Sequence, residues 1–334
     1  MAEQPKQKTS NQHTVPRCYL KRFASDKLRF FAFNKSFQKS REIGTRSATV
    51  QEDFYDLHPS TLVGLDTDTE WVETTFSKLE ARYEQVLSAA ISEASAGRIS
   101  VETGSSLAQF MTLQWLRTVG MRKALLDADA MMKKELIEAW YAEYAPGVPL
   151  PKFVRGEGYE AGFHANMMFD HDTVFGFAQR FWDLYWIVGR NKTSQPFYTS
   201  DDPVILDRIP PLNDGPEVPL WIGIEYAFPL DSEFILVMMD RYMASKTMNT
   251  NGVNYERVTV DMDETAVERY NALQVAKSTQ YVFCQENKFE LAKRLCKEEP
   301  RICSLDRNRE LIDTTTLKYE NGKWSIVINP MPLT

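Results

Sequence analysis

The spacing of apolar residues predicts helices in the first half of the chain. Between residues 68 and 94 they recur every three or four positions, as in a helix that buries one face: Val72, Phe76, Leu79, Tyr83 and Val86. The same spacing begins again near Gly104, runs into the 120s and can extend toward Tyr144. Prolines interrupt it in AEYAPGVPLPKF, and it returns between about residues 158 and 180.

From residue 181 the pattern changes to short apolar runs bounded by turn residues, which is typical of strands. These runs are DLYWIVGR, QPFYTS, PVILDRI, WIGIEYAFPL and EFILVMM. Helices are expected at 263–281 and 289–296, before a hairpin that turns at Asn321–Gly322. We therefore expect an α+β fold, with a helix-rich part (13–180) packed on a mostly antiparallel sheet (181–334) in a single domain.

The N-terminal segment NQHTVPRCYLKRFAS mixes docking residues with polar ones. Residues 1–12 are polar and are expected to form a flexible tail. A short helix capped by Thr14 should then be anchored by four apolar residues: Val15, Tyr19, Leu20 and Phe23. His13 precedes this helix, and packing gives it no evident task. A β-hairpin turning at Asn34–Lys35 is expected next.

The composition predicts a soluble globular protein. Of the 334 residues, 43% are apolar and 25% are charged. No run approaches the roughly 20 apolar residues of a membrane span, and the start MAEQPKQKTSNQ is polar, unlike a secretory signal. The four cysteines form no C-x-x-C pair. We therefore expect a cytoplasmic protein that does not contact the membrane.

The charge is unevenly distributed. The whole chain carries −7, yet residues 1–50 contain 11 Lys/Arg and 3 Asp/Glu. One interpretation is a solvated basic surface beside an acidic body. The other is a basic arm that binds nucleic acid or a nucleotide.

Several common catalytic signatures are absent from the sequence. It contains no G-x-G-x-x-G, G-x-x-x-x-G-K-[ST], G-x-S-x-G or H-E-x-x-H motif. This argues against a standard dinucleotide, P-loop, α/β-hydrolase or zincin mechanism, and it leaves other chemistry open.

Polar residues interrupt the apolar stripes of the two first long helices. Gln114 and Arg117 border one stripe, and Glu73 and Glu80 line the edge of the other. A short linker makes these helices neighbours, and a buried guanidinium needs acidic partners. The group is therefore either an interhelical bridge that fixes packing or a polar pocket. In a pocket, the carboxylates could bind Mg²⁺ or perform acid–base catalysis.

A further candidate is Asp201, in the stretch FYTSDDPV at the end of a predicted strand. Ser and Asp side chains followed by proline suit a turn. Loops that follow strands are also frequent places for catalytic groups. Ser200 lacks the surroundings of a nucleophilic serine, so Asp201 is the better functional candidate.

Several motifs together resemble a bacterial family of unknown function, DUF4238, over about residues 11–285. They are His13-x-x-Pro16-x-x-Tyr19-Leu20-x-x-Phe23, EDFYDL, the helix with Glu73 and Glu80, Gln114-x-x-Arg117-Thr118, the Trp186 strand, FYTSDDPV, FPLDSEFIL and NALQVAKSTQYVF. The chain has Asp202 where the family often has Asn.

The resemblance implies that His13, Glu73, Glu80, Gln114, Arg117 and Asp201 belong to one pattern. Such a set resembles a hydrolytic site, which gives the hypothesis of a nuclease or phosphoesterase that belongs to a bacterial defence system. His13 would be the acid or base, and Glu73, Glu80 and Asp201 would hold Mg²⁺ or Mn²⁺ or activate water. Arg117 would stabilise developing charge, and Gln114 would orient substrate. The alternatives are a non-catalytic nucleotide or nucleic-acid binding module, or a purely structural buried network.

Overall fold

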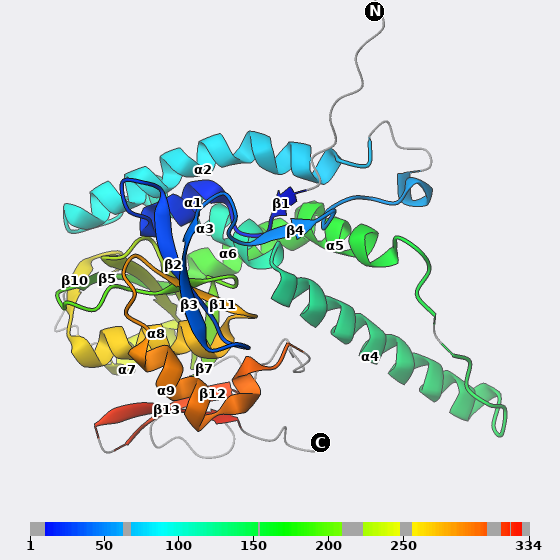
Figure 1. The fold of residues 1–334 in the computed structure, drawn as a ribbon. Coiled ribbons are helices and arrows are strands. Elements are labelled where there is room, and N and C mark those ends of the chain that lie inside the picture. The colour runs from blue at the N-terminus through cyan, green and yellow to red at the C-terminus, as the bar shows by residue number, and fades with distance from the viewer. Residues whose placement is uncertain are drawn as a thin grey trace, which may run out of the picture.

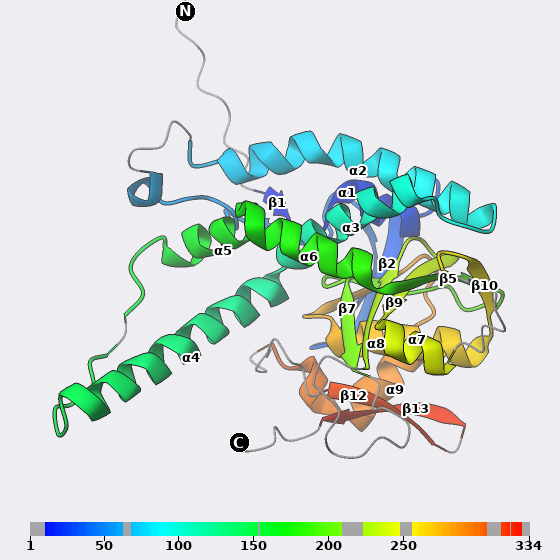
Figure 2. The ribbon, with the colours of Figure 1, turned by 180° about the vertical axis from the view of Figure 1, so that it is seen from behind.

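The molecule has an α+β architecture, which confirms the fold class that the apolar pattern predicts. The computed structural model describes residues 11–62, 68–152, 154–208, 223–247, 256–305, 315–320 and 322–328. In Figures 1 and 2 the long helix α2 lies on one side of the strands, and α8, α9 and the last hairpin lie on the other. Helix α4 projects away from both.

The helices of the first half are α1 (Arg17–Leu20), α2 (Trp71–Ser95), α3 (Val101–Leu116), α4 (Val119–Tyr144), α5 (Tyr159–Phe169) and α6 (His171–Asp183), with 3₁₀ turns at Lys21–Phe23 and Pro59–Leu62. Two expected long helices are each divided by a polar cap. Thr118 accepts from the Met121 N–H at 3.1 Å and starts α4, and Asp170 accepts from the Thr173 N–H at 2.8 Å and starts α6. The capping residues therefore divide each expected helix, although the apolar spacing continues past them.

The expected N-terminal helix is shorter and begins differently. Its N-cap is Pro16, without a side-chain cap, and Thr14 instead donates to the Thr49 carbonyl at 3.2 Å. The polar tail was expected to reach residue 12, but Asn11–His13 form strand β1, which pairs with β4 (Val50–Glu52). Gln12 is buried there and donates to Asp56 at 2.6 Å. The four predicted anchors of α1 are all fully buried.

The larger sheet has the strand order β10-β5-β9-β8-β7. Its strands are β5 (Tyr185–Asn191), β7 (Ile205–Arg208), β8 (Ile224–Pro229), β9 (Phe234–Met239) and β10 (Thr259–Met262). All neighbours are antiparallel except β10 and β5. Leu236 and Met238 pack with the helices of the first half, whereas Ile235 and Val237 pack toward α8. Because both faces are covered, β9 is apolar at every position.

A second sheet, with the order β3-β2-β11-β6, brings distant segments together. The expected hairpin is present as β2 (Arg29–Asn34) and β3 (Lys39–Gly44), but its turn lies at residues 35–38, since Asn34 still pairs with Lys39. Strand β2 also pairs with β11 (Tyr281–Cys284), which pairs with β6 (Thr199–Ser200). Tyr19 of α1 ties this sheet to the larger one. Its hydroxyl hydrogen-bonds the Thr199 hydroxyl at 2.8 Å and donates to the Pro229 carbonyl at 2.9 Å.

The remaining elements are α7 (Arg241–Thr247), α8 (Glu264–Lys277), α9 (Glu290–Glu298), a 3₁₀ turn at Pro300–Cys303, β12 (Thr315–Glu320) and β13 (Lys323–Ile328). The terminal hairpin is confirmed by the pairing of β12 with β13. Helix α8 was expected to reach Tyr281, but it ends at Lys277, since Tyr281 already belongs to β11.

Candidate functional site

Arg117 lies at the junction of α3 and α4, with only 1% of its surface exposed. Its Nη2 donates to the backbone carbonyl of His13 at 2.5 Å, and its guanidinium carbon lies 4.0 Å from the centre of the Phe76 ring. The Tyr55 hydroxyl donates to the Arg117 carbonyl at 2.8 Å and accepts from Nε at 3.4 Å. Strand β1, the segment after β4 and the α2–α3 pair therefore meet at one side chain.

Two carboxylates on α2 are electrostatic neighbours of Arg117. Glu73 and Glu80 are separated by two turns and are partly buried. Burial raises the pKa of both carboxyls, and the Arg117 charge offsets only part of this rise. Within the part of the chain that the structure describes, no salt bridge joins Arg117 to either carboxylate. Arg117 and the two carboxylates, which were predicted to form an interhelical bridge, therefore lie near one another without a direct contact.

Several buried polar atoms around Arg117 have no hydrogen-bond partner among the described residues: His13 Nε2, Glu73 Oε2, Gln114 Nε2, Gln114 Oε1 and Arg117 Nη1. Gln114 lies one turn before Arg117 on α3 and is 1% exposed. An unsatisfied buried group costs about 1–3 kcal/mol. Such a concentration at one place is more than packing requires, and it suits groups that receive a water molecule or a ligand. We call His13, Glu73, Glu80, Gln114 and Arg117 the Arg117 cluster.

The protonation state of the His13 imidazole is suited to a general base. Burial lowers the pKa of its imidazole, a hydrogen bond to the Arg46 backbone offsets part of the change, and the positive charges of Arg117 and Arg17 lower it further. The ring is therefore neutral at pH 7. Since Nε2 has no partner among the described residues, the Arg46 contact leaves that nitrogen available to accept a proton.

Asp201 occupies a structural position instead. Its carboxylate accepts from three successive backbone N–H groups, those of Thr279 at 2.8 Å, Gln280 at 2.7 Å and Tyr281 at 2.8 Å. These bonds hold the turn that leads into β11. Asp201 also lines a cavity of about 390 Å³ with Thr14 and Lys123. The contacts of Asp201 therefore agree with the interpretation of FYTSDDPV as a turn.

The expected metal ligands do not form a metal site. Across the described ranges, no group of three or more His, Cys, Asp or Glu side chains could hold a metal ion. The three backbone bonds to Asp201 occupy the carboxylate that was expected to complete a set with Glu73 and Glu80. Mg²⁺ or Mn²⁺ coordinated by these three residues does not fit this arrangement.

A second, largely buried arginine provides a useful contrast. Arg269 of α8 donates to Glu225 at 2.5 Å and to Asp207 at 2.9 Å, and the Tyr270 hydroxyl donates to Glu225 at 3.4 Å. Burial raises the pKa of Glu225, and Arg269 opposes that rise. We call these four residues the Arg269 network. The sequence motifs gave no signal for it, because its members come from three separate elements.

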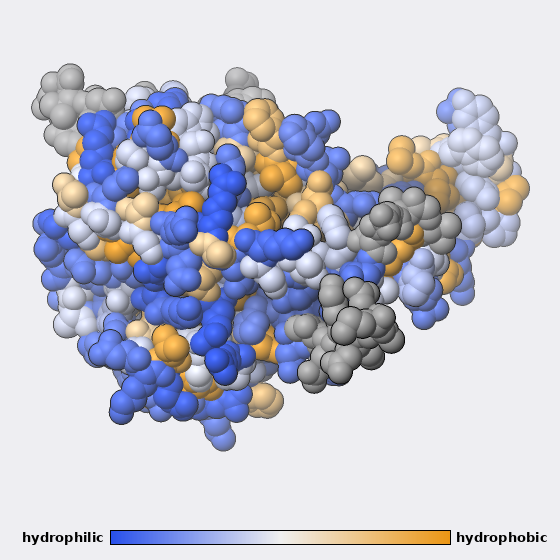
Figure 3. Space-filling view, turned by 90° about the horizontal axis from the view of Figure 1, so that it is seen from above, coloured by the Kyte–Doolittle hydropathy of each residue, from blue (hydrophilic) through white to orange (hydrophobic). Residues whose placement is uncertain are grey.

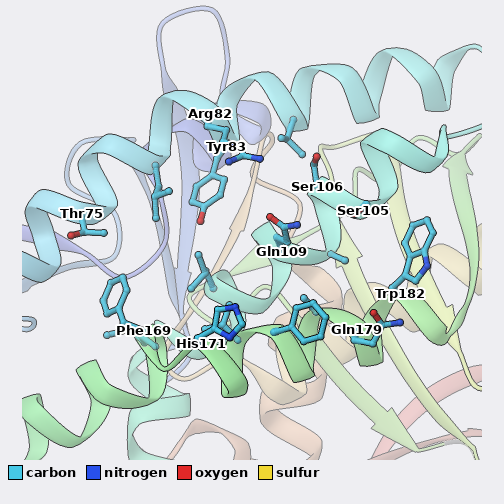
Figure 4. Close-up of a pocket in the computed structure, with 18 residues that line it drawn as sticks. Thr75, Arg82, Tyr83, Ser105, Ser106, Gln109, Phe169, His171, Gln179 and Trp182 are labelled. Atoms are coloured by element: carbon cyan, nitrogen blue, oxygen red, sulfur yellow. The ribbon is translucent and has the colours of Figure 1, made fainter.

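A groove of about 540 Å³ lies between α2, α3 and α6, and none of the five residues of the Arg117 cluster lines it. Figure 4 shows Tyr83 and Arg82 from α2, Gln109 from α3 and Trp182 from α6 around it. Tyr83 connects the two regions, since its hydroxyl interacts electrostatically with Arg117 and Glu80. The lining is largely apolar, with a few polar groups, which is typical of ligand pockets. Sequence reasoning placed Tyr83 only in the core.

Tyr55 is a second residue whose role was missed. Its side chain is buried, packs against Phe76 with the rings tilted and their centres 5.3 Å apart, and holds Arg117 in place. The motif EDFYDL contains it, but the sequence could not show the pairing of β1 with β4 that brings it to α3. Gln12 accepts from the Tyr55 N–H at 2.5 Å and fixes that segment.

The basic N-terminal region is partly used for internal contacts. Lys35 is fully buried and donates to the carbonyls of Val275 and Ser278 at the end of α8. Lys39, Arg41 and Arg46 are exposed on or just after β3. The same region thus contains both structural cations and a solvent-facing basic edge.

Comparison with known proteins identifies a family without a known activity. The model of the family described as "Protein of unknown function (DUF4238)" matches residues 11–288. No curated protein and no solved structure matches the chain significantly. Among the described residues, no helix is long and apolar enough to cross a membrane.

Proposed function

The chain belongs to the DUF4238 family, and we propose that it is a hydrolase that cleaves phosphoesters in the Arg117 cluster. The observation that supports this proposal is the set of buried, unpartnered polar atoms on His13, Glu73, Gln114 and Arg117. A neutral base, a carboxyl with a raised pKa and a fixed cation are the groups that ester hydrolysis needs.

In this mechanism His13 is the general base and Glu73 is the general acid. A water oxygen bonds to phosphorus while one proton of the water passes to His13 Nε2. The bond from phosphorus to the leaving oxygen breaks, and the leaving oxygen takes a proton from the Glu73 carboxyl, whose pKa is raised by burial. Arg117 Nη1 stabilises the charge on the phosphoryl oxygens, and Gln114 positions the phosphoryl group. The charge of Glu80 favours the charged form of Arg117.

The surroundings favour a nucleotide or a nucleic acid as the substrate. Arg46, part of the exposed basic edge with Lys39 and Arg41, adjoins the cluster, because its backbone contacts the His13 ring. Basic side chains beside a phosphoryl site attract polyanions.

The test is hydrolysis by the full chain of bis-p-nitrophenyl phosphate, nucleotides, RNA and DNA, with and without Mg²⁺ or Mn²⁺. We expect His13→Gln to lower kcat/KM by about 100- to 10,000-fold and Arg117→Lys to lower it by about 100-fold or more. His58→Gln is the matched control, since His58 lies on the surface and bonds Ser60. Turnover that survives both cluster substitutions, or no turnover of any phosphoester, overturns the proposal.

A salt-dependent affinity for nucleic acid without turnover would instead support a binding module. The two functions separate in one experiment, because Arg117→Lys weakens binding in both cases, whereas His13→Gln changes only the rate of hydrolysis.

A further inference from the structure

Two thiols meet where α9 ends. Cys296 lies near the end of α9 and is fully buried, and Cys303 ends the 3₁₀ turn at Pro300–Cys303 and is half-buried. A hydrogen bond joins the two side chains. Cys303 also packs against the apolar cluster that contains Cys296, Phe289 and Ile302. The two sulfur atoms are therefore in contact, although they come from different elements.

The backbone holds both sides of this contact. The Glu299 N–H donates to the Leu295 carbonyl at 2.9 Å where α9 ends, and the Ile302 N–H donates to the Glu299 carbonyl at 3.2 Å in the turn that follows. From the turn between β2 and β3, the Ser36 hydroxyl donates to the Cys303 carbonyl at 3.1 Å. A disulfide has a demanding geometry, and two thiols that are already held side by side need little movement to reach it.

The two thiols differ in protonation and in access to solvent. The hydrogen bond to Cys303, together with burial, raises the pKa of Cys296, and the nearby Lys35 ammonium offsets part of this rise. Cys296 therefore keeps its proton, whereas Cys303 is the sulfur that ionises first and the one that solvent can reach. Because the thiolate is the nucleophile, Cys303 is the sulfur that reacts with an oxidant.

The other two cysteines lack these features. Cys18 in α1 and Cys284 in β11 are buried, and burial raises the pKa of Cys18 to about 12 and that of Cys284 to about 11. Among the described residues, neither has a hydrogen bond to another thiol. Buried thiols of this kind are inert, so these two cysteines serve as internal controls.

We propose that Cys296 and Cys303 are a redox-sensitive pair, which closes into a disulfide when hydrogen peroxide oxidises Cys303. The Cys303 thiolate bonds to one peroxide oxygen while the O–O bond breaks, which gives a sulfenic acid and, after uptake of a proton, one water. The Cys296 sulfur then bonds to the Cys303 sulfur, and the sulfenic hydroxyl leaves as a second water with the Cys296 proton. The two thiols lose two electrons, and exchange with a dithiol restores them.

The pair lies apart from the groups proposed for hydrolysis. Helix α9 lies on the opposite side of the strands from α2, which carries Glu73 and Glu80 (Figures 1 and 2), and away from the face viewed in Figure 3. The bridge would tie the 3₁₀ turn to α9 and, through Ser36, to the turn between β2 and β3. The proposal is therefore independent of the hydrolase function.

The experiment is peptide mapping of the full chain after treatment with hydrogen peroxide. The folded protein is oxidised, the peroxide is removed with catalase, and the remaining thiols are alkylated with iodoacetamide in urea. Trypsin cuts after Arg294, Lys297 and Arg301, so the two thiols leave in different peptides. We expect these peptides to be linked, with the loss of two hydrogens, and to be released by dithiothreitol. Cys18 and Cys284 should be alkylated in full.

Substitutions test the order in which the sulfurs react. With Cys303→Ser, Cys296 should remain a thiol after peroxide treatment. With Cys296→Ser, Cys303 should stop as a sulfenic acid, which dimedone labels. The matched control is Cys18→Ala, which should form the bridge as the wild type does. Full alkylation of Cys296 and Cys303 in the wild type overturns the proposal, as does a Cys303 disulfide between two chains, or oxidation of Cys296 that survives Cys303→Ser.

Discussion

The Arg117 cluster and the Arg269 network contain the same kinds of groups in different states. Each has an arginine with two carboxylates nearby, and a tyrosine lies beside each arginine: Tyr55 beside Arg117 and Tyr270 beside Arg269. Arg269 contacts both of its carboxylates directly, at 2.5 and 2.9 Å. Arg117 donates hydrogen bonds to a backbone carbonyl and to a tyrosine hydroxyl. Arg117 Nη1 and Glu73 Oε2 have no partner among the described residues.

The difference separates a structural role from a functional one. In a buried ion pair with direct contacts each charge already has a partner, so little charge is left for a ligand to bind. A cluster that keeps charge and hydrogen-bonding capacity unused carries a standing energetic penalty. Functional sites often sacrifice stability in this way. The two regions thus provide internal controls for each other.

The largest expected effect is on stability, from removal of each arginine. Arg269→Met should lower the free energy of unfolding by about 3–5 kcal/mol, because Glu225 and Asp207 stay buried without their cation. Arg117→Met should lower it by about 1–2 kcal/mol, since it loses neutral-acceptor hydrogen bonds and no salt bridge. Urea unfolding followed by circular dichroism measures both. Equal losses would remove the distinction between the two regions.

A smaller effect is expected in the pH dependence of stability and activity, which should distinguish His164 from His13. His164 is fully paired, since Arg122 donates to its Nδ1 at 2.9 Å and its Nε2 contacts the Leu116 carbonyl at 2.7 Å. Burial, with the Arg122 charge, lowers the pKa of His164 from 6.5 to about 3. The unfolded chain therefore takes up this proton first as the pH falls. Below pH 6.5 the residue should remove about 1.4 kcal/mol of stability per pH unit.

His164→Gln keeps an acceptor and a donor but does not titrate. Its unfolding free energy should therefore fall less steeply than that of the wild type between pH 6.5 and 5, and the carboxyl contributions cancel in the comparison. Parallel curves would show that His164 does not titrate in this way. His13 has an unpartnered Nε2, so its lowered pKa should appear in kcat/KM, as a loss of activity on the acid side below pH 6.5.

Much of the fold follows from periodicity in the sequence. The stripe Val72, Phe76 and Tyr83 predicts the buried face of α2, and alternation or continuous apolar runs predict β5 and β9. These predictions fail where capping side chains, which apolar spacing does not reveal, end a helix. The caps at Thr118 and Asp170 divide helices whose apolar spacing continues across them. The parallel pairing of β10 with β5 has no local signature at all.

Only part of the candidate site could be predicted from the sequence. Helical spacing puts Gln114 and Arg117 on one face, and the short linker brings Glu73 and Glu80 toward them. The arrival of His13 and Tyr55 depends on β1 and β4, two three-residue strands too short for any pattern to reveal. Asp201 shows the opposite failure, because residue type alone cannot distinguish a carboxylate that binds backbone N–H groups from one that binds a ligand.

The most direct test of the central claim is a matched pair of substitutions, Glu73→Gln and Glu225→Gln, each assayed for unfolding free energy and for phosphoester hydrolysis. Glu225→Gln should lower the unfolding free energy by about 2–4 kcal/mol, because Arg269 loses a charged partner. Glu73→Gln should change it by less than about 0.5 kcal/mol and lower kcat/KM by about 100-fold. Equal destabilisation by the two substitutions, with turnover unaffected by Glu73→Gln, would show that the Arg117 cluster is structural.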